Sequence, residues 1–286
     1  MWIKACVNRL KPYVPVWAIP WGVLLYRAVM HCACYWHALD DAASIRKTKF
    51  KALPSVWLRY RVGGKPDLDA FIEVGRLASE DIRNILEKHG RKLSSFRTVL
   101  DFGCGCGRTL LWMQAQAADS QKWFGCDIDA EAVAWCREHL SFAQCVVNEG
   151  SPPSPFQNDQ FDFIYAISVF THFSEAYQFA WLRELRNILK PSGLLLATVV
   201  GRDIWGRRLP RSLARQVERD GFFFLSCNVM GKVFPDFYRT AYHTEEYVRR
   251  RFSEEFEVLD YIPQGLGKFQ DVVLLRKREA LPNAEA

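Results

Sequence analysis

The stretch that decides the fold is Val99-Leu-Asp-Phe-Gly-Cys-Gly-Cys-Gly-Arg108. It begins as a short apolar strand at residues 98–102, passes through three glycines, and gives way to a helical pattern at residues 109–117. Glycines after a strand permit a tight turn and let a ligand approach the backbone where a Cβ atom would clash. The start of the next helix offers that ligand unpaired N–H groups and a partial positive charge. The stretch therefore predicts a ligand-binding turn.

Strands and helices are expected to alternate on both sides of this turn. Apolar residues at helical spacing fill residues 67–90, where Gly90 is placed to end a helix. Further strands are expected at residues 122–127, 144–147, 161–167, 194–200, 257–262 and 271–276, and further helices at 130–140, 175–189 and 244–256. This spacing is typical of βαβ units. We expect an α/β fold with a seven-stranded, mostly parallel sheet and helices on both faces.

Three segments do not follow this alternation of strands and helices. Residues 1–52 form a basic, aromatic N-terminal extension that we expect to be helical, and residues 278–286 read as a flexible tail of the domain at 53–277. Residues 201–241 follow the fifth strand and are aromatic, basic and irregular. Ligands in such sheets bind at the carboxyl ends of the strands. We therefore expect residues 201–241 to form a lid over the substrate, with Trp205 and Phe222 to Phe224 as its apolar wall.

The N-terminal extension carries an uneven charge. The chain has a net charge of +6, yet residues 1–61 hold ten Lys or Arg against only Asp40 and Asp41. Residues 14–30 are apolar but are interrupted by Pro15 and Pro20, and they fall short of the roughly 20 apolar residues that a membrane span needs. No signal-peptide pattern is visible. The extension is expected either to pack on the catalytic domain or to lie on an anionic membrane surface. The expected location is cytoplasmic, with peripheral contact at the inner membrane face in the second case.

The nine cysteines predict neither a disulfide framework nor a metal site. Their number is odd and no C-x-x-C pair occurs. We expect free, mostly buried thiols in a reducing compartment. Cys104 and Cys106, inside the glycine-rich turn, are interpreted as small spacers.

Two acidic residues indicate which ligand the turn binds. Asp127 ends the strand that follows the turn, where a carboxylate accepts hydrogen bonds from both ribose hydroxyls. Asp101 precedes the first glycine, where it suits a ligand with ammonium and sulfonium charges and repels a pyrophosphate. Arg108 stands where the nicotinamide dinucleotide fingerprint requires Gly or Ala. Together these residues favour S-adenosylmethionine as the cofactor.

Four ordered segments resemble the motifs of the class I, Rossmann-like methyltransferases. The turn at 99–108 looks like their motif I, and Gly125-Cys-Asp-Ile-Asp129 resembles their ribose-binding strand end. Phe161 to His172 is similar to their fourth-strand motif, and Leu189-Lys-Pro-Ser-Gly-Leu194 to the turn before their fifth strand. The resemblance covers roughly residues 58–277 and is closest to bacterial members that act on small molecules. It implies methyl transfer from S-adenosylmethionine.

The resemblance also implies roles for individual residues. Gly103, Gly105 and Gly107 would bind the cofactor, with the backbone of Gly103 and Gly105 facing its methionine part, and Asp101 would face its ammonium group. Asp127 would hold the ribose, and Ile128 would lie against the adenine. Asn148 stands where the family often has an aspartate near the adenine amino group, so its role stays open. Ala166 would offer its carbonyl oxygen, and Asp129 is interpreted as the cap of the next helix.

Three residues are candidates for catalysis. His172 follows the fourth strand, where the mouth of the substrate site is expected, and serves either as a general base or as a packing residue. Tyr242 and His243 precede the helix at 244–256 and are placed either to reach that mouth or to pack, with Thr244 capping the helix. Tyr165 is expected to pack in the sheet.

The expected function is methyl transfer to an oxygen or nitrogen of a small-molecule, glycan or lipid-linked acceptor. The alternatives are a nucleic-acid methyltransferase, a nicotinamide-dependent oxidoreductase and a non-enzymatic cofactor-binding module. A base-flipping enzyme usually carries Asn/Asp-Pro-Pro-Tyr/Phe after the fourth strand, where this chain has Ala166-Ile-Ser-Val, so nucleic acid is a disfavoured partner.

Overall fold

The structure is a computed structural model of the 286-residue chain. It describes residues 52–225 and 239–279 apart from Lys65, together with scattered positions between 29 and 50. Most of the N-terminal extension, the stretch 226–238 of the expected lid, and residues 280–286 of the tail lie outside the described residues.

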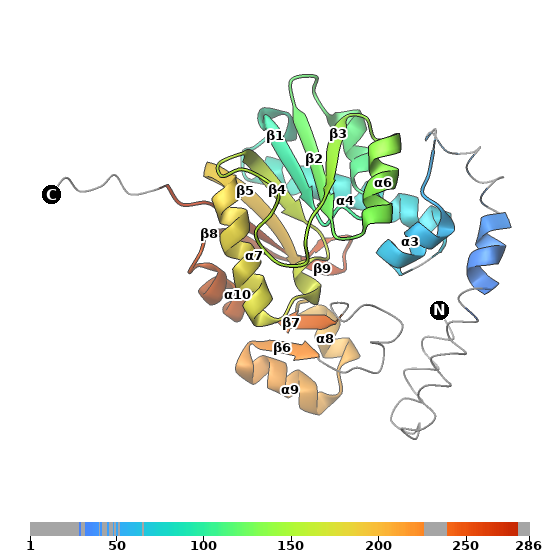
Figure 1. The fold of residues 1–286 in the computed structure, drawn as a ribbon. Helices are drawn as coiled ribbons and strands as arrows, with labels where there is room; N and C mark the ends of the chain where they lie inside the picture. Colours follow the sequence, from blue (N-terminus) through green and yellow to red (C-terminus); the bar gives the residue numbers. More distant parts are fainter. Residues whose placement is uncertain are drawn as a thin grey trace.

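The centre of the molecule is a seven-stranded sheet with the order β3-β2-β1-β4-β5-β9-β8 (Figure 1). Its strands are β1 Thr98–Phe102, β2 Lys122–Asp127, β3 Ala143–Val147, β4 Phe161–Ala166, β5 Leu189–Val199, β8 Glu257–Leu266 and β9 Gln270–Arg276. Strands β1 to β5 are parallel to one another, whereas β9 runs antiparallel to both β5 and β8. The chain crosses from β1 outward to β3 and then returns to β4, so the order reverses beside β1. This confirms the expected Rossmann-like α/β fold.

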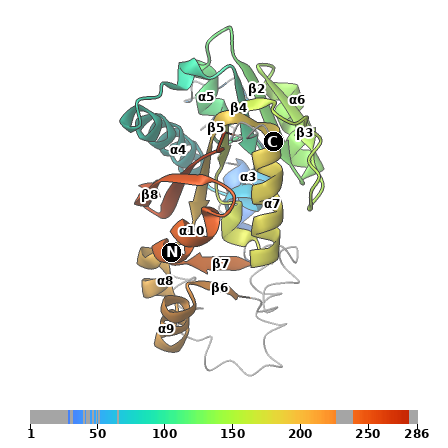
Figure 2. The same cartoon turned by 90° about the vertical axis from the view of Figure 1, so that its left-hand side faces the viewer.

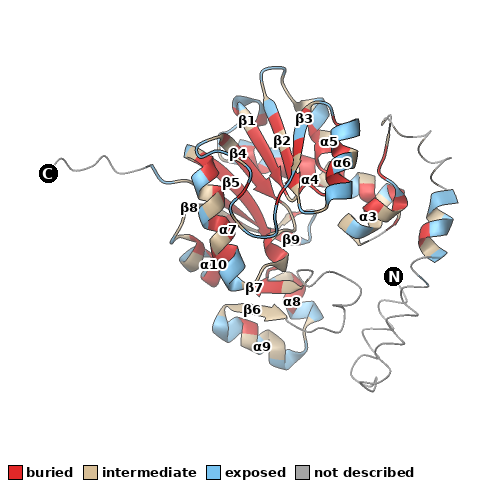
Figure 3. Cartoon of the chain, viewed as in Figure 1, coloured by how far each residue is buried: buried red, intermediate tan, exposed pale blue. Residues whose placement is uncertain are grey.

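Helices cover both faces of the sheet, and α4 and α7 lie on opposite sides of the strands in Figure 2. One core layer contains residues of α4 Leu68–Lys88, α5 Leu110–Met113 and α6 Ala130–His139. The other contains residues of α7 Glu175–Ile188 and α10 Glu245–Phe252. Figure 3 shows that the central strands are almost wholly buried between these layers, as a parallel sheet requires.

The longest helix, α4, follows directly from its sequence. The side chain of Asp67 accepts a hydrogen bond from the backbone N–H of Ala70, which caps the first turn. Ile82 and Leu86 lie on its apolar face, pack against the sheet and are fully buried. Gly90, with a φ of +68°, lies just after the helix in the left-handed conformation that glycine adopts without strain. The predicted end of this helix is thereby confirmed.

Short helical segments complete the domain. They are α3 Val56–Gly63 and the 3₁₀ turns η3 Leu93–Ser95, η4 Gln114–Gln116 and η5 Phe170–His172. The helix expected at 109–117 is in fact the four-residue α5 followed by η4. Among the described residues, no helix is both long and apolar enough to span a bilayer.

The segment expected to be irregular, residues 201–241, is folded where it is described, and this prediction was wrong. It forms α8 Arg202–Arg208, α9 Arg211–Asp220 and β6 Phe222–Leu225, which pairs antiparallel with β7 Thr240–His243 below the main sheet in Figure 1. Ile204, Trp205 and Val217 bury a small separate core. The many arginines of the segment face solvent and mask this sparse apolar pattern, which explains the error.

Candidate active site

A cavity of about 630 Å³ opens at the carboxyl ends of the central strands. Its walls come from α3, from the glycine-rich turn after β1, and from the segments that follow β2, β3 and β4. The start of α7 and the two residues Phe224 and Arg239 complete it. The cavity therefore lies where the strand order reverses, which is the usual ligand position in open α/β sheets.

The glycine-rich turn forms the floor of this cavity because its first two glycines have no side chains. Gly103 and Gly105 have φ values of +81° and +52°. A Cβ atom on Gly103 would lie 2.3 Å from Val169, and one on Gly105 would lie 2.6 Å from Val62. Gly107 does not line the cavity, since a Cβ atom there would meet Leu140 on the α6 side at 2.5 Å. The first two glycines therefore shape the ligand surface, and the third packs the turn against α6.

Asp127 fixes the turn and faces the cavity. Its Oδ2 accepts a hydrogen bond from the N–H of Gly105 at 2.8 Å, and its Oδ1 accepts one from the N–H of Asp129 at 2.9 Å. Burial raises the pKa of Asp127, and these backbone N–H donors oppose that rise. Each carboxylate oxygen accepts more than one hydrogen bond, so Asp127 keeps capacity for a ligand.

Asp101 lines the same cavity and is almost fully buried, with an exposed fraction of 3%. Burial raises the pKa of its carboxyl group well above the ordinary value, and the nearby Tyr165 hydroxyl opposes that rise. Tyr165 itself is fully buried in the sheet and is paired in register with Asp101. A cationic ligand group in the cavity would favour the ionised form of Asp101.

The residues after β2 and β3 form one end of the cavity. Ile128 lines it and remains 38% exposed. Asn148 also lines it, and its side-chain Nδ2 donates to the carbonyl oxygen of Glu149 at 2.8 Å. Ala166 is fully buried at the end of β4 and does not line the cavity; after this strand, the first lining residue is Ile167.

Arg61 is a cavity residue that the sequence did not reveal. It reaches from α3 to the start of α6, where its Nε lies 2.5 Å from Asp129 and its Nη2 lies 2.8 Å from Glu131. Asp129 also caps α6, because its Oδ1 accepts from the N–H groups of Glu131 and Ala132. The predicted cap is confirmed, and the carboxylate of Asp129 also forms the ion pair with Arg61. The ion pairs join distant segments, so no local pattern predicts them.

His172 lines the cavity and has a defined tautomer. Its Nδ1 lies 2.6 Å from the carbonyl oxygen of Arg239, which can only accept a hydrogen bond. Nδ1 therefore carries the hydrogen, and Nε2 carries the lone pair of the neutral ring. Burial lowers the pKa of His172 below its usual value, so the ring is neutral at pH 7.

The structure does not bring the other two catalytic candidates to the cavity. His243 is fully buried, and its Nε2 lies 3.1 Å from the Oε1 atom of Gln178. The Nε2 atom of Gln178 lies 2.9 Å from the same ring nitrogen and also donates to the carbonyl oxygens of Phe170 and Phe173 at 3.2 Å, so the Gln178 amide links His243 to the turn before α7. Burial lowers the pKa of His243 to about 3. Tyr242 stacks on Phe223, and Thr244 caps α10 as expected.

Aromatic side chains line the cavity near His172. Phe173 precedes the cap of α7, Tyr177 and Trp181 lie in the first half of that helix, and Phe224 comes from β6. Trp205, expected in this wall, is instead buried in the small core of α8 and α9, where its Nε1 donates to the carbonyl oxygen of His243 at 2.9 Å. Phe222 packs on Tyr247. Of the aromatic residues expected in the wall, the described structure places only Phe224 at the cavity.

Comparison with known proteins adds three findings. A family model described as a methyltransferase domain matches residues 99–193, which include the glycine-rich turn and β1 to β4. A malonyl-[acyl-carrier protein] O-methyltransferase of Porphyromonas gingivalis is 24% identical over 183 residues. That match covers 64% of this chain and 66% of the relative, which is just under two thirds of its length.

Solved structures share the fold. A Burkholderia thailandensis 1,6-didemethyltoxoflavin N1-methyltransferase, solved with its substrate and S-adenosylhomocysteine, superposes with a TM-score of 0.52 at 17% identity. The match covers 85% of this chain and 91% of that one. An S-adenosylmethionine-dependent methyltransferase of Mesorhizobium loti superposes with a TM-score of 0.51 at 14% identity, and the match covers 70% of this chain and 99% of that one.

Proposed function

We propose that this chain, a member of the class I S-adenosylmethionine-dependent methyltransferases, transfers a methyl group to an oxygen or nitrogen of a small-molecule, glycan or lipid-linked acceptor. The observation that carries the proposal is the single cavity that joins the glycine-rich turn and Asp127 to His172 and the aromatic wall. Cofactor and acceptor would meet there without a further rearrangement of the main sheet.

The residues present fit S-adenosylmethionine. Gly103 and Gly105 line the cavity and carry no side chain, so the backbone of the turn can contact the methionine part. Asp101 is a buried carboxyl group suited to the ammonium group, and Asp127 is suited to the ribose hydroxyls. Ile128 and Asn148 would then lie beside the adenine. When bound, the cofactor supplies a methyl group on a positively charged sulfur.

His172 is the residue we propose as the general base. The Arg239 carbonyl holds Nδ1 protonated, which leaves the lone pair on Nε2, and the lowered pKa keeps the ring neutral. A neutral imidazole at the cavity accepts the proton that a hydroxyl, amide or ammonium acceptor must lose. The neighbouring aromatic side chains would exclude water and hold the acceptor in line with the sulfur–methyl bond.

The acceptor is proposed to be small because the wall that faces His172 is mostly apolar. Phe173, Tyr177, Trp181 and Phe224 offer flat rings, and Arg239 is a cation at the same end. Such a wall suits an apolar acceptor that carries an acidic or polar group. The Porphyromonas gingivalis relative is a malonyl-[acyl-carrier protein] O-methyltransferase, which supports an acceptor with an acidic group.

The experiment for this proposal identifies the product. The protein is incubated with fractionated extract and S-adenosylmethionine that carries an isotopically labelled methyl group, and the products are resolved by mass spectrometry. We expect label in a small or lipid-linked molecule, and much less of it with the His172→Phe variant. Label found only in nucleic acid would contradict the proposed acceptor class.

Residues 1–52 lie largely outside the described residues. We propose for them either packing on the catalytic domain or contact with an anionic membrane surface. If their basic side chains contact an anionic surface, the full chain would sediment with anionic vesicles and high salt would release it. A variant that lacks residues 1–52 would then stay in solution. Equal behaviour of the two proteins would leave packing on the catalytic domain as the role of the extension.

A further inference from the structure

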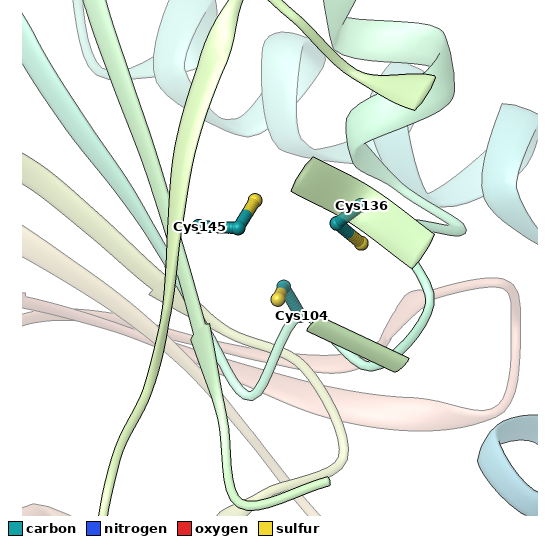
Figure 4. Close-up of side chains that lie close together, drawn as sticks. All are labelled: Cys104, Cys136 and Cys145. Atoms are coloured by element: carbon teal, nitrogen blue, oxygen red, sulfur yellow. The ribbon is translucent and has the colours of Figure 1, made fainter. Parts of the chain in front are cut away.

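Three cysteines from separate parts of the sequence lie close together behind the glycine-rich turn. Cys104 belongs to the turn itself, Cys136 to α6 and Cys145 to β3 (Figure 4). Their sulfur atoms all lie within 4.8 Å of one another, and all three residues are buried. The spacing of the cysteines in the sequence predicts no such cluster, because only the fold brings the turn, the helix and the strand together.

Two glycines keep space around these sulfur atoms. Gly125 on β2 lies beside Cys145 in the sheet register, and a Cβ atom on it would lie 3.1 Å from the sulfur atoms of both Cys104 and Cys145. Gly107 stands on the other side, where a Cβ atom would lie 3.2 Å from the sulfur of Cys136. Side chains at these two positions would press on the sulfur atoms, so glycine at both positions leaves room for the three sulfur atoms.

We propose that Cys104, Cys136 and Cys145 bind a soft, thiophilic metal ion through three thiolates. Thiolates select ions such as Cu⁺, Zn²⁺ or Cd²⁺ over the hard cations Mg²⁺ and Ca²⁺. A metal–sulfur bond of about 2.3 Å places three sulfur atoms around one ion at roughly 4 Å from each other, which the observed spacing accommodates. Each thiol loses its proton to solvent as its sulfur–metal bond forms, and the oxidation state of the ion does not change.

One cationic side chain lies next to the cluster. Arg137 donates its Nε hydrogen to the carbonyl oxygen of Cys145 at 2.7 Å, so a guanidinium group offsets part of the thiolate charge. The S–H groups of Cys136 and Cys104 donate to the carbonyl oxygen of Gly105 at 3.5 and 3.6 Å, and a bound metal ion would replace these protons. An ion at the cluster would thus lie against the back of the cofactor turn and would brace it against α6 and β3.

The test measures metal binding by the full, reduced chain without air. Cd²⁺ is titrated against a chromophoric chelator, while the ultraviolet sulfur-to-cadmium charge-transfer band is recorded. We expect one tightly held equivalent with the band intensity of three thiolates, and at least a tenfold loss of affinity in Cys145→Ser. The matched control is Cys126→Ser, which alters a fully buried thiol of β2 outside the cluster and should keep the tight equivalent.

A second measurement needs no variant. X-ray absorption of the one-to-one cadmium complex should show a first shell of sulfur atoms only, three in number. A shell with nitrogen or oxygen neighbours would overturn the proposal, and so would a wild-type chain that binds Cd²⁺ no more tightly than Cys145→Ser. Loss of the ion in Cys126→Ser, with its circular dichroism unchanged, would place the site elsewhere.

Discussion

Asp101 and Asp127 carry the same side chain on adjacent strands of one sheet, but their surroundings differ. Asp101 is the last residue but one of β1 and Asp127 is the last residue of the adjacent β2; Asp127 accepts hydrogen bonds from two backbone N–H groups, whereas Asp101 is more deeply buried. The sequence predicts that both face the ligand. It does not predict that Asp127 also ties down Gly105, because that bond depends on how the turn folds back over β2.

The first prediction concerns the protonation of Asp101. Burial raises its pKa, and a cofactor ammonium beside it would lower that pKa again by favouring the ionised form. Binding of S-adenosylhomocysteine should therefore release a proton, and affinity should rise with pH until the pH exceeds the raised pKa of Asp101. Calorimetry in two buffers with different ionisation enthalpies measures this release. Asp101→Asn should abolish it, and an equal release from that variant would refute the assignment.

The second prediction concerns His172. A general base must be neutral, and the pKa of this ring is lowered below 6.5, so the rate should be constant above pH 6.5 and fall only in more acidic solution. His172→Phe should lower kcat by about 10²- to 10⁴-fold, because that is the usual contribution of a general base. Affinity for S-adenosylhomocysteine should be unchanged. An unaltered kcat would assign His172 to packing.

The third prediction concerns His243 and the free energy of unfolding. The pKa of this ring is about 3 in the folded chain and about 6.5 when unfolded, so the unfolded state binds more protons between those values. Its contribution to stability is complete above pH 6.5 and is lost as the pH falls toward 3, by at most about 1.4 kcal/mol per pH unit. Urea unfolding at pH 7 and pH 5 should show a smaller difference for His243→Asn than for the wild type. Equal differences would mean that the ring is charged in the fold.

At the scale of elements, alternating apolar patterns predict the parallel part of the sheet closely. The bounds of β1 and β2 agree with the prediction residue for residue, because the glycine-rich turn and Asp127 mark where both strands end. The sequence does not predict β6, because its four residues, Phe222–Leu225, are all aromatic or apolar and show no alternation. Only the pairing of β6 with β7 determines which side chains of β6 face the cavity and which face the small core.

The fourth prediction uses these two faces of β6. Phe224 lines the cavity, whereas its neighbour Phe223 stacks on Tyr242 in the small core. Phe224→Ala should raise KM for the acceptor by tenfold or more, as the loss of an apolar wall implies, with little change in Tm. Phe223→Ala is the matched control and should lower Tm while KM stays near the wild-type value. If both variants behave alike, β6 does not form the acceptor wall.

At the scale of the whole molecule, the fold is far easier to predict than the site around the acceptor. The residues that we propose to bind the cofactor lie within short motifs, so the turn and the ends of β2 and β3 could be assigned to the site from the sequence. Arg61, Trp181 and Arg239 come from α3, α7 and the segment before β7, and they meet only in the folded chain. The same is true of the three thiols behind the turn.

The most direct test of the account is a calorimetric titration of the full chain with S-adenosylhomocysteine and, separately, with NADH. We predict one S-adenosylhomocysteine per chain and no NADH. The loss of charge-assisted hydrogen bonds, worth about 1.5–3 kcal/mol each, should make Asp127→Ala bind at least tenfold more weakly. Circular dichroism of that variant should match the wild type. Tight binding of NADH, or an affinity for S-adenosylhomocysteine that Asp127→Ala leaves unchanged, would contradict the assignment of this cavity to the methyl donor.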